Sequence, residues 1–309
     1  MPITLHHVAL AGPQAGEAVS FYTNDWGLRE TGRDESSVRL AAADYPGDDY
    51  SLVIIQSDLK TVDHFCLVSD DPELIGQIRE RVAANGVKVL DDVRSCPGIE
   101  NALHVVDLDG RHIEIGYHPA GGTAAVPSEA VPSENLPHKP AHIVLNTPDI
   151  DAITDWYQDK LGFGLRDWRE HQMSFLYYNS DHHTVAFSKA PHASLNHVAW
   201  EIGDLNQFFR AVARLSESPT ADKLYGPGRH GPGEYVFCYF VDPLGFICEY
   251  ETDAIKIADP SDYEFRVHKW SPESSDAWLG VLSGGMPDRF REVARNQPDA
   301  GWLAALAQA

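Results

Sequence analysis

The sequence repeats itself once, with a displacement of 135 residues. The strand-like stretch "LHHVALAG" near the start resembles "AHIVLNTP" at residue 141, and an amphipathic segment typical of a helix follows each of them. Tyr22 aligns in this way with Tyr157, and Gly27 with Gly162. Such a repeat restricts the fold to two copies of one unit, each reading strand, helix, several strands, a second helix and more strands.

The composition of the chain divides it into four segments. Residues 1–118 are the expected first domain, and residues 119–140, rich in Pro, Ser, Gly and Ala, are the expected linker. Residues 141–255 are the expected second domain. The remaining residues 256–309, in which "MPDRFREVARNQPD" and "GWLAALAQA" have a helical pattern, are too few for a domain. We expect this tail to pack on the second domain.

The charge of the chain argues against two classes of partner. A formal net charge of −22 makes nucleic acid and anionic membrane surfaces poor partners, and no apolar run is long enough to span a membrane. The N-terminal residues lack the pattern of a signal peptide. None of the four cysteines forms a CxxC pair, which favours free thiols and a cytoplasmic location: Cys66, Cys96, Cys238 and Cys248.

Glu249 lies inside the apolar strand-like segment "FICEY". A buried carboxylate is costly unless it is paired or bound to a cation. Strand alternation puts Ile247 and Glu249 on one face, and Phe246, Cys248 and Tyr250 on the other. The sequence must therefore supply a partner for Glu249 from another part of the chain.

Two histidines in other strand-like segments are candidates for that partner. His142 lies in "AHIVL" and His197 in "NHVAW". Two imidazoles and one carboxylate on one side of a metal ion leave neighbouring coordination positions free, as in non-haem Fe(II) oxygenases. The same residue types recur in the first half, which strengthens this interpretation. The alternative is an arginine that reaches Glu249 in space and pairs with it.

The sequence resembles the vicinal oxygen chelate superfamily, and within it the two-domain type I extradiol ring-cleavage dioxygenases. The resemblance covers about residues 1–255 and is sharpest in "GPGRHGPGEYVFCYFVDPLGFICEY". It implies an α+β fold of two tandem domains, each made of paired βαβββ modules that form a curved, barrel-like mixed sheet with outer helices. It also implies an Fe(II) site, less often Mn(II), in the second domain, with His142, His197 and Glu249 as ligands.

The resemblance further implies an acid–base histidine at His183, next to His182, and substrate-contacting residues at His230 and Tyr239. It implies a small aromatic diol or triol and O₂ as substrates, a ring-opened product, and a homo-oligomer. A neutral histidine can accept the proton that a catechol must lose. Candidate pocket residues precede the His183 loop: Met173, Phe175 and Tyr177.

The first half contains the same three metal-binding residue types at His7, His64 and Glu114. Its surroundings differ, because Tyr50 lies fourteen residues before His64 and His104 lies ten residues before Glu114. The position that corresponds to His230 is Ser95. We therefore expect catalysis in the second half, and a second metal site in the first half stays open.

Two other functions are compatible with parts of this pattern. A glyoxalase or isomerase of the same superfamily would use a carboxylate base and usually four ligands from two modules, and would not need His183, His230 and Tyr239 together. A non-catalytic binder of small molecules would need no metal ligands at all. The three candidate ligands in the second half argue against the binder.

Overall fold

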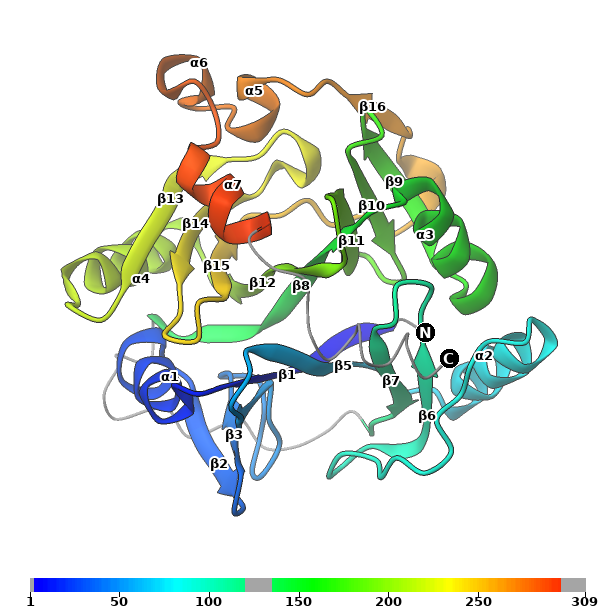
Figure 1. The fold of residues 1–309 in the computed structure, drawn as a ribbon. Helices are drawn as coiled ribbons and strands as arrows, with labels where there is room; N and C mark the ends of the chain where they lie inside the picture. The colour runs from blue at the N-terminus through cyan, green and yellow to red at the C-terminus, as the bar shows by residue number, and fades with distance from the viewer. Residues whose placement is uncertain (1–2, 120–134, 296–309) are drawn as a thin grey trace.

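The computed structural model describes residues 3–119 and 135–295. The first unit consists of β1 (Thr4–Gly12), α1 (Ala15–Phe21), η1 (Tyr22–Trp26), β2 (Arg29–Arg33), β3 (Ser37–Ala41), β4 (Leu52–Gln56), β5 (Thr61–Ser69), α2 (Pro72–Ala84), β6 (Glu100–Val106) and β7 (His112–Tyr117). Its seven strands form one sheet in the order β2-β3-β4-β1-β5-β7-β6 (Figure 1).

The second unit repeats this order and adds one strand. It consists of β8 (Pro137–Thr147), α3 (Ile150–Trp156), η3 (Tyr157–Leu161), β9 (Gly164–Arg169), β10 (Met173–Tyr177), β11 (Val185–Lys189), β12 (Ser194–Ile202), α4 (Leu205–Glu217), β13 (Asp222–Arg229), η4 (Pro232–Glu234), β14 (Val236–Val241) and β15 (Ile247–Thr252). Its sheet has the order β13-β14-β15-β12-β8-β11-β10-β9-β16, in which the edge strand β16 (Arg266–His268) comes from the tail.

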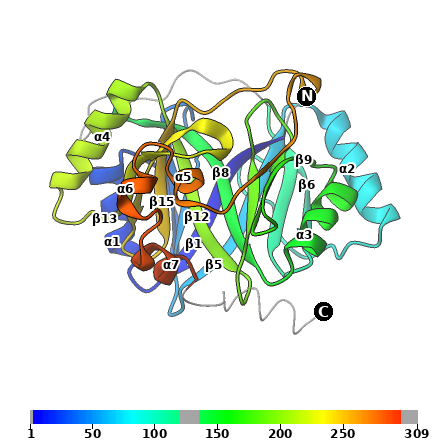
Figure 2. The same ribbon diagram turned by 90° about the horizontal axis from the view of Figure 1, so that it is seen from above.

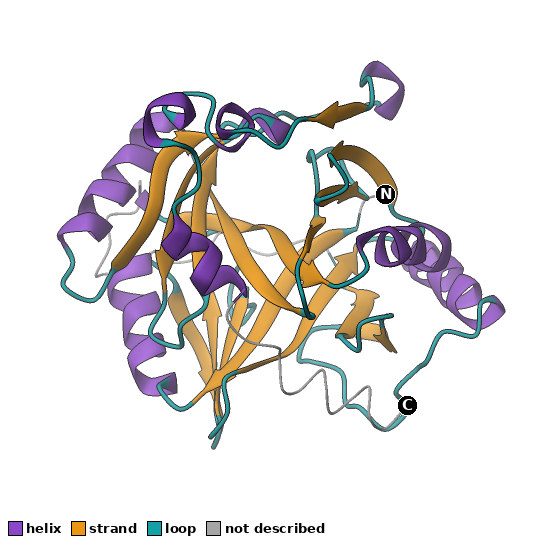
Figure 3. Ribbon diagram, turned by 45° about the horizontal axis from the view of Figure 1, so that its top comes forward, coloured by secondary structure: helices purple, strands orange, loops and turns teal. Residues whose placement is uncertain are grey.

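The predicted α+β architecture of two tandem sheets with outer helices is confirmed (Figure 3). In each sheet the first strands of its two modules, β1 with β5 and β8 with β12, pair antiparallel at the centre. One module departs from the expected βαβββ order, because only the bridge Val89–Val105 stands where β13 stands in the second unit. The segment between α2 and β6 contains Gly86, Pro97 and Gly98 and runs as a loop.

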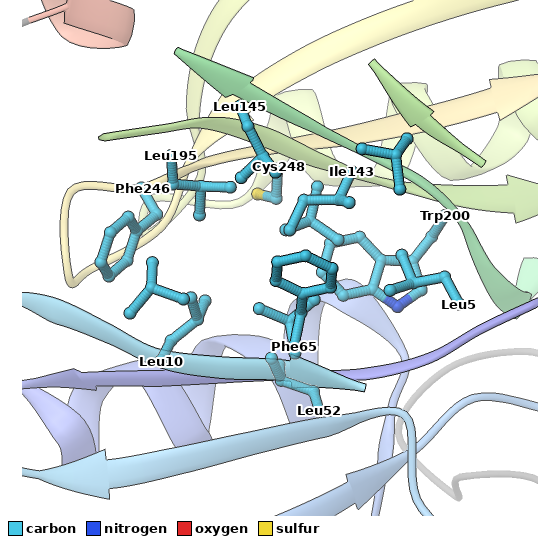
Figure 4. Packing of buried hydrophobic residues seen from close by; sticks show 14 of the residues in the cluster. Leu5, Leu10, Leu52, Phe65, Ile143, Leu145, Leu195, Trp200, Phe246 and Cys248 are labelled. Carbon is cyan, nitrogen blue, oxygen red and sulfur yellow. The ribbon is translucent and has the colours of Figure 1, made fainter. Parts of the chain in front are cut away.

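One face of each sheet packs against the other unit (Figure 4). The strand alternation expected for β15 is confirmed, since Cys248 and Tyr250 lie in this shared core while Ile247 belongs to a cluster on the opposite face. The shared core includes Leu5, Leu10, Leu52, Phe65, Ile143, Leu145, Leu195, Trp200 and Phe246. Burying such side chains contributes about 1.5–3 kcal/mol each, so the two units stabilise one another.

The first helix of each unit ends in the same way. α1 continues as the π-helical turn η1 and ends at Gly27, and α3 continues as η3 and ends at Gly162. The φ angles of these glycines are 102° and 89°, in the left-handed region that glycine enters without steric cost. Both helices lie at the flanks of the sheets, where α1 is near α4 and α3 is near α2 (Figures 1 and 2).

The π-helical turns anchor each unit to the other by matched hydrogen bonds. The hydroxyl of Tyr22 donates to Oδ2 of Asp242 at 2.9 Å, and the hydroxyl of Tyr157 donates to Oδ2 of Asp107 at 3.0 Å. Both pairs are buried and are related by the sequence repeat. The repeat therefore extends to the polar contacts between the units.

The chain after β15 runs back over the second unit. It contains η5 (Pro260–Asp262), β16 (Arg266–His268), α5 (Pro272–Ser275), α6 (Gly280–Ser283) and α7 (Asp288–Arg295). β16 pairs parallel with β9, and α7 contacts β12 and β13. The segment "GWLAALAQA", expected to be helical, lies outside the described residues.

Two further expectations concern the residue at which the second domain begins and the state of the cysteines. β8 begins at Pro137, inside the range expected for the linker. All four cysteines are free. None of the described helices is long and apolar enough to cross a membrane.

Removing the hydroxyl of Tyr22 tests the contact between the units. We expect Tyr22→Phe to lower the free energy of unfolding by roughly 1.5–3 kcal/mol at pH 8, because a hydrogen bond to a buried carboxylate is lost. Urea denaturation measures the change. Tyr178→Phe, which removes the same oxygen from a half-buried side chain, is the control, and equal effects of the two changes would contradict the proposed anchor.

Candidate metal centre and active site

Three strands of the second sheet bring His142, His197 and Glu249 together. His142 on β8 and Glu249 on β15 both pair with Ala199 on the strand between them, β12. Residues paired across a sheet share a face, and His197, two residues before Ala199, shares it too. The small side chain of Ala199 leaves room for the three larger ones above it.

An ion-pair contact to His142 and a hydrogen bond to His197, both from outside the cluster, fix how the two histidines point. Nδ1 of His142 lies 3.0 Å from Oε2 of Glu251, a second buried carboxylate of β15. Nδ1 of His197 lies 2.8 Å from Oδ1 of Asn196. Because carboxylate and amide oxygens only accept, each Nδ1 carries the hydrogen and each Nε2 carries a lone pair.

The orientation of the Asn196 amide is set by the tail. The side-chain amide of Asn146 donates to the carbonyl of Ala294, at 2.5 Å, which can only accept. Oδ1 of Asn146 therefore accepts from Nδ2 of Asn196, at 2.9 Å, and this leaves Oδ1 of Asn196 for His197. A backbone carbonyl of α7 thus determines the tautomer of a candidate metal ligand.

Three acceptor atoms converge in this way on one point. The two Nε2 atoms are 3.3 Å apart, and they lie 3.4 Å (His142) and 3.1 Å (His197) from Oε2 of Glu249. Both Glu249 oxygens are buried and make no hydrogen bond within the described part of the chain. Acceptors placed like this require a cation between them, and two imidazoles with a carboxylate suit a divalent transition metal.

The electrostatics of the site agree with a bound positive charge. Burial would raise the pKa of Glu249, but the adjacent rings of His197 and His142 lower it to about 2. Burial would lower the pKa of His142, but Glu251 and Glu249 raise it to about 10, so a metal ion that binds Nε2 of His142 would replace a proton there. The partners of Glu249 among the described residues are histidines, so the alternative of an arginine partner is wrong.

His183 lies beside this cluster, with its ring centroid 4.2 Å from that of His142. Its Nδ1 is 3.1 Å from Nδ1 of His182, whose Nε2 is 3.1 Å from Oδ2 of Asp167. Asp167 accepts, so His182 donates through Nε2 and accepts from His183 through Nδ1. Nε2 of His183 is then a buried lone pair, and it makes no hydrogen bond within the described residues. Burial and the nearby His142 lower the pKa of His183 well below its usual value.

His230 and Tyr239 lie together on the other side of the cluster. Nδ1 of His230 lies 2.6 Å from the carbonyl oxygen of Ser275, so Nδ1 donates and Nε2 accepts. The Tyr239 hydroxyl, 2.9 Å from this Nε2, is the donor. Burial and Glu249 raise the pKa of Tyr239 well above its usual value, so it keeps its proton. Burial lowers the pKa of His230 to about 4.

A cavity reaches the cluster between the sheet and the tail. It is lined by His197, His230 and Tyr239, and on the tail side by Trp270, Met286 and Phe290. The candidate pocket residues Met173 and Phe175 also line it.

Tyr177 is not among the lining residues, and its ring lies 3.5 Å from the Arg166 guanidinium. A register shift between β10 and β9 at Phe175/Leu176 separates it from the other two.

Several residues that shape the site did not stand out in the sequence. Glu251 could have been found, since it follows Glu249 at the spacing of strand alternation. Asp167 also accepts from the tail residues Tyr263, at 2.7 Å, and His268, at 2.8 Å. These contacts join segments about a hundred residues apart and have no local signal.

The first unit repeats only part of this arrangement. His7 and Glu114 both pair with Cys66 on β5, which corresponds to Ala199, and His64 lies two residues before it. His104 pairs with Glu114 as Tyr239 pairs with Glu249.

The residues of the first unit that correspond to His183 and His230 are Tyr50 and Ser95. The hydroxyl of Tyr50 donates to the carbonyl of Pro97, at 3.0 Å, and Ser95 lies in the loop before β6.

Comparisons with known proteins agree with this geometry. Residues 139–250 match the glyoxalase/bleomycin resistance protein/dioxygenase superfamily. Metapyrocatechase 2 of Cupriavidus necator is 27% identical over 220 residues, which cover 63% of this chain and 68% of that protein. A manganese-dependent 2,3-dihydroxybiphenyl 1,2-dioxygenase of Geobacillus genomosp. 3 is 25% identical and covers 93% of this chain and 97% of its own length.

Solved structures show the same fold over nearly the whole chain. The Mn(II)-bound glyoxalase from Novosphingobium aromaticivorans has a TM-score of 0.82 and 28% identity, covering 93% of this chain and 94% of that one. Homoprotocatechuate 2,3-dioxygenase from Brevibacterium fuscum has a TM-score of 0.77 and 18% identity, covering 98% and 92%.

The match to the superfamily model thus falls on the second unit, and the similarity to a solved glyoxalase structure extends over nearly the whole chain. The relatives named as dioxygenases agree with the resemblance seen in the sequence.

The two buried carboxylates of β15 should affect metal binding to different degrees. We expect Glu249→Gln to abolish binding of the second-unit metal, because a ligand is lost. Glu251→Gln should weaken it by roughly 10–100-fold, because it only orients His142. Competition with a chelator of known affinity measures both.

Glu201→Gln is the control, since Glu201 pairs with Glu251 across β12 and β15 but binds Lys256, with Nζ 3.2 Å from its carboxylate. Equal losses in all three variants would contradict a direct role for Glu249.

Proposed function

We propose that the second unit uses Fe(II), bound by His142, His197 and Glu249, to cleave a catechol-type ring beside its two hydroxyl-bearing carbons. The observation that supports this most strongly is the convergence of three acceptor atoms next to the free Nε2 of His183. Three protein ligands leave neighbouring positions for substrate and dioxygen, which suits iron(II). The names of the relatives, a metapyrocatechase and a dihydroxybiphenyl dioxygenase, support a catechol or dihydroxybiphenyl as substrate.

The metal, when bound, would hold the catechol oxygens and dioxygen side by side and allow electrons to pass between them. The surrounding side chains would exclude water and manage protons. The site is lined on one side by the sheet and on the other by the tail, and its apolar surfaces at Met173, Phe175 and Phe290 fit an aromatic ring.

His183 is the candidate base for the substrate hydroxyl. Its ring is neutral and its Nε2 lone pair has no hydrogen bond within the described residues, so it can accept a proton at neutral pH. The protonated ring could then return the proton to the departing oxygen when the O–O bond breaks. Asp167 stabilises the protonated His183 through His182. Its carboxylate accepts the Nε2 hydrogen of His182, and Nδ1 of His182 accepts the hydrogen of His183.

His230 and Tyr239 would contact the substrate oxygens. Nε2 of His230 is an acceptor, since its Nδ1 is committed to Ser275, and it holds the Tyr239 hydroxyl. A substrate hydroxyl that donates to this Nε2 would replace Tyr239 there and free the Tyr239 hydrogen for another acceptor. Tyr239 keeps its proton and can donate to a developing oxyanion. Both functions depend on the tail, because Ser275 fixes the tautomer of His230.

A glyoxalase-type reaction is the alternative that the Novosphingobium structure raises. Against it, all three ligands come from one unit, and His183, His230 and Tyr239 surround them. The two functions differ in their use of oxygen.

Oxygen consumption with a panel of catechols decides between them. We expect iron-loaded protein to consume one O₂ per ring and to give a yellow ring-opened product. Glu249→Gln should lose this activity, whereas the corresponding change in the first unit, Glu114→Gln, should keep it. An absence of oxygen uptake with every catechol and dihydroxybiphenyl, or its loss in Glu114→Gln alone, would contradict the proposal.

Substituting the two neighbouring histidines tests the acid–base assignment. His183→Phe should keep the metal and bind substrate, while turnover falls by roughly 10²–10⁴-fold, the usual contribution of a positioned acid–base group. His182→Phe should reduce turnover less, because His182 acts through His183. Stopped-flow kinetics under air, with metal content measured on the same samples, gives both values. A larger loss in His182→Phe than in His183→Phe would show that the assignment is wrong.

A further inference from the structure

A second cluster of metal-binding side chains lies in the first unit, on the face of its sheet away from the second unit. Four residues each place one donor atom within 4.8 Å of the other three. Three of them are buried and one is half-buried. We call them the first-unit cluster: His7, His64, Cys96 and Glu114.

Hydrogen bonds fix the tautomer of His7. Nδ1 of His7 lies 2.8 Å from Nδ1 of His6, and Nε2 of His6 lies 3.0 Å from Oδ1 of Asp49. Asp49 accepts from His6, so the Nδ1 of a neutral His6 accepts from His7. Nε2 of His7 is therefore a lone pair.

Nε2 of His64 is also a lone pair, because a carboxylate accepts the hydrogen on the other ring nitrogen. Nδ1 of His64 lies 2.6 Å from Oδ2 of Asp63, so Nδ1 donates and Nε2 carries a lone pair. The two Nε2 atoms of His7 and His64 nevertheless face each other at 3.0 Å. Oε2 of Glu114 lies 3.9 Å from Nε2 of His64. This oxygen is fully buried and makes no hydrogen bond in the described part of the chain. As in the second unit, these acceptors require a cation between them.

Cys96 adds a donor that the second unit lacks. Its Sγ lies 3.3 Å from Nε2 of His64, and its backbone N–H donates to Oε1 of Glu114 at 2.9 Å. The residue 135 positions later is Gly231, which has no side chain to offer. The first-unit cluster therefore has four protein donors of three kinds, and the second-unit site has three.

We propose that the first-unit cluster binds a zinc ion in a closed, four-coordinate structural site. Zinc bonds of about 2.0–2.3 Å in tetrahedral geometry place neighbouring donors roughly 3.3–3.8 Å apart, which the printed separations approach. A thiolate with two imidazoles and a carboxylate selects zinc over the harder divalent ions. Four protein ligands leave no position for dioxygen or substrate.

The zinc ion would tie the loop before β6 to the centre of the sheet. Tyr50 covers the cluster, with its ring 4.9 Å from that of His7 and its hydroxyl on the carbonyl of Pro97. In the second unit the corresponding loop carries His230 and borders the cavity. The zinc site would hold the loop of the first unit closed.

Metal analysis and cobalt spectroscopy on the full-length protein test this proposal. We expect one zinc per chain in addition to the second-unit metal. We expect Cys96→Ser and Glu114→Gln each to lose the zinc and keep the other metal, and His197→Ala to show the reverse. Protein loaded with Co(II) should show a thiolate-to-cobalt charge-transfer band, because Cys96 is one of the proposed ligands whereas the second-unit site contains no thiol. Cys96→Ser should remove that band.

Cys66→Ala is the matched control, because Cys66 lies between His7 and Glu114 where the second unit has Ala199. It should keep both the zinc and the band. The proposal fails if the wild type has no thiolate band, if Cys96→Ser keeps it, or if Cys66→Ala alone removes it. The wild-type spectrum alone shows whether a thiolate binds the metal, so the proposal can be tested even if a variant does not fold. A variant that loses zinc but still consumes oxygen would show that the zinc site is independent of catalysis in the second unit.

Discussion

Strand β15 has to satisfy two environments at once, and the rest of the molecule depends on its register. Cys248 and Tyr250 point into the core shared by the units, while Ile247, Glu249 and Glu251 point to the opposite face. A slip of one residue would bury two carboxylates in an apolar core and remove the metal ligand from its partners. The hydrophobic packing between the units therefore fixes the position of the catalytic carboxylate.

Histidine orientation follows one physical rule in both units. Each candidate ligand has its Nδ1 hydrogen directed to an acceptor outside the site, so its Nε2 lone pair faces inward. The acceptors differ between the two histidines of the second unit. Glu251 contacts His142 directly. His197 is held by a series of hydrogen bonds through Asn196 and Asn146 that ends at the carbonyl of Ala294. Because that carbonyl belongs to α7, the tail is part of the metal centre, although none of its described residues is among the candidate ligands.

The sequence predicted those features that have a period or a repeat. The displacement of 135 residues was enough to predict two copies of one unit, and the alternation in "FICEY" with two histidines in other strands predicted the three converging side chains. The curved mixed sheets were expected from the family resemblance. The network around Asp167 could not be predicted, because its donors come from His182, Tyr263 and His268 in distant segments. Cys96 was equally hidden, since a loop has no periodicity to show which way a side chain points.

The loop before the penultimate strand shows how one duplicated element acquires two functions. In the second unit it carries His230, and the glycine that follows has no side chain that could close a metal held by His142, His197 and Glu249. In the first unit Cys96 occupies the position of that glycine and its sulfur lies among the ligands. A single side chain at this position decides whether two imidazoles and a carboxylate keep free coordination positions for a reaction or are closed by a fourth donor. The same fold can therefore contain one site for chemistry and one for stability, and the second requires no change in the strands that position the first three ligands.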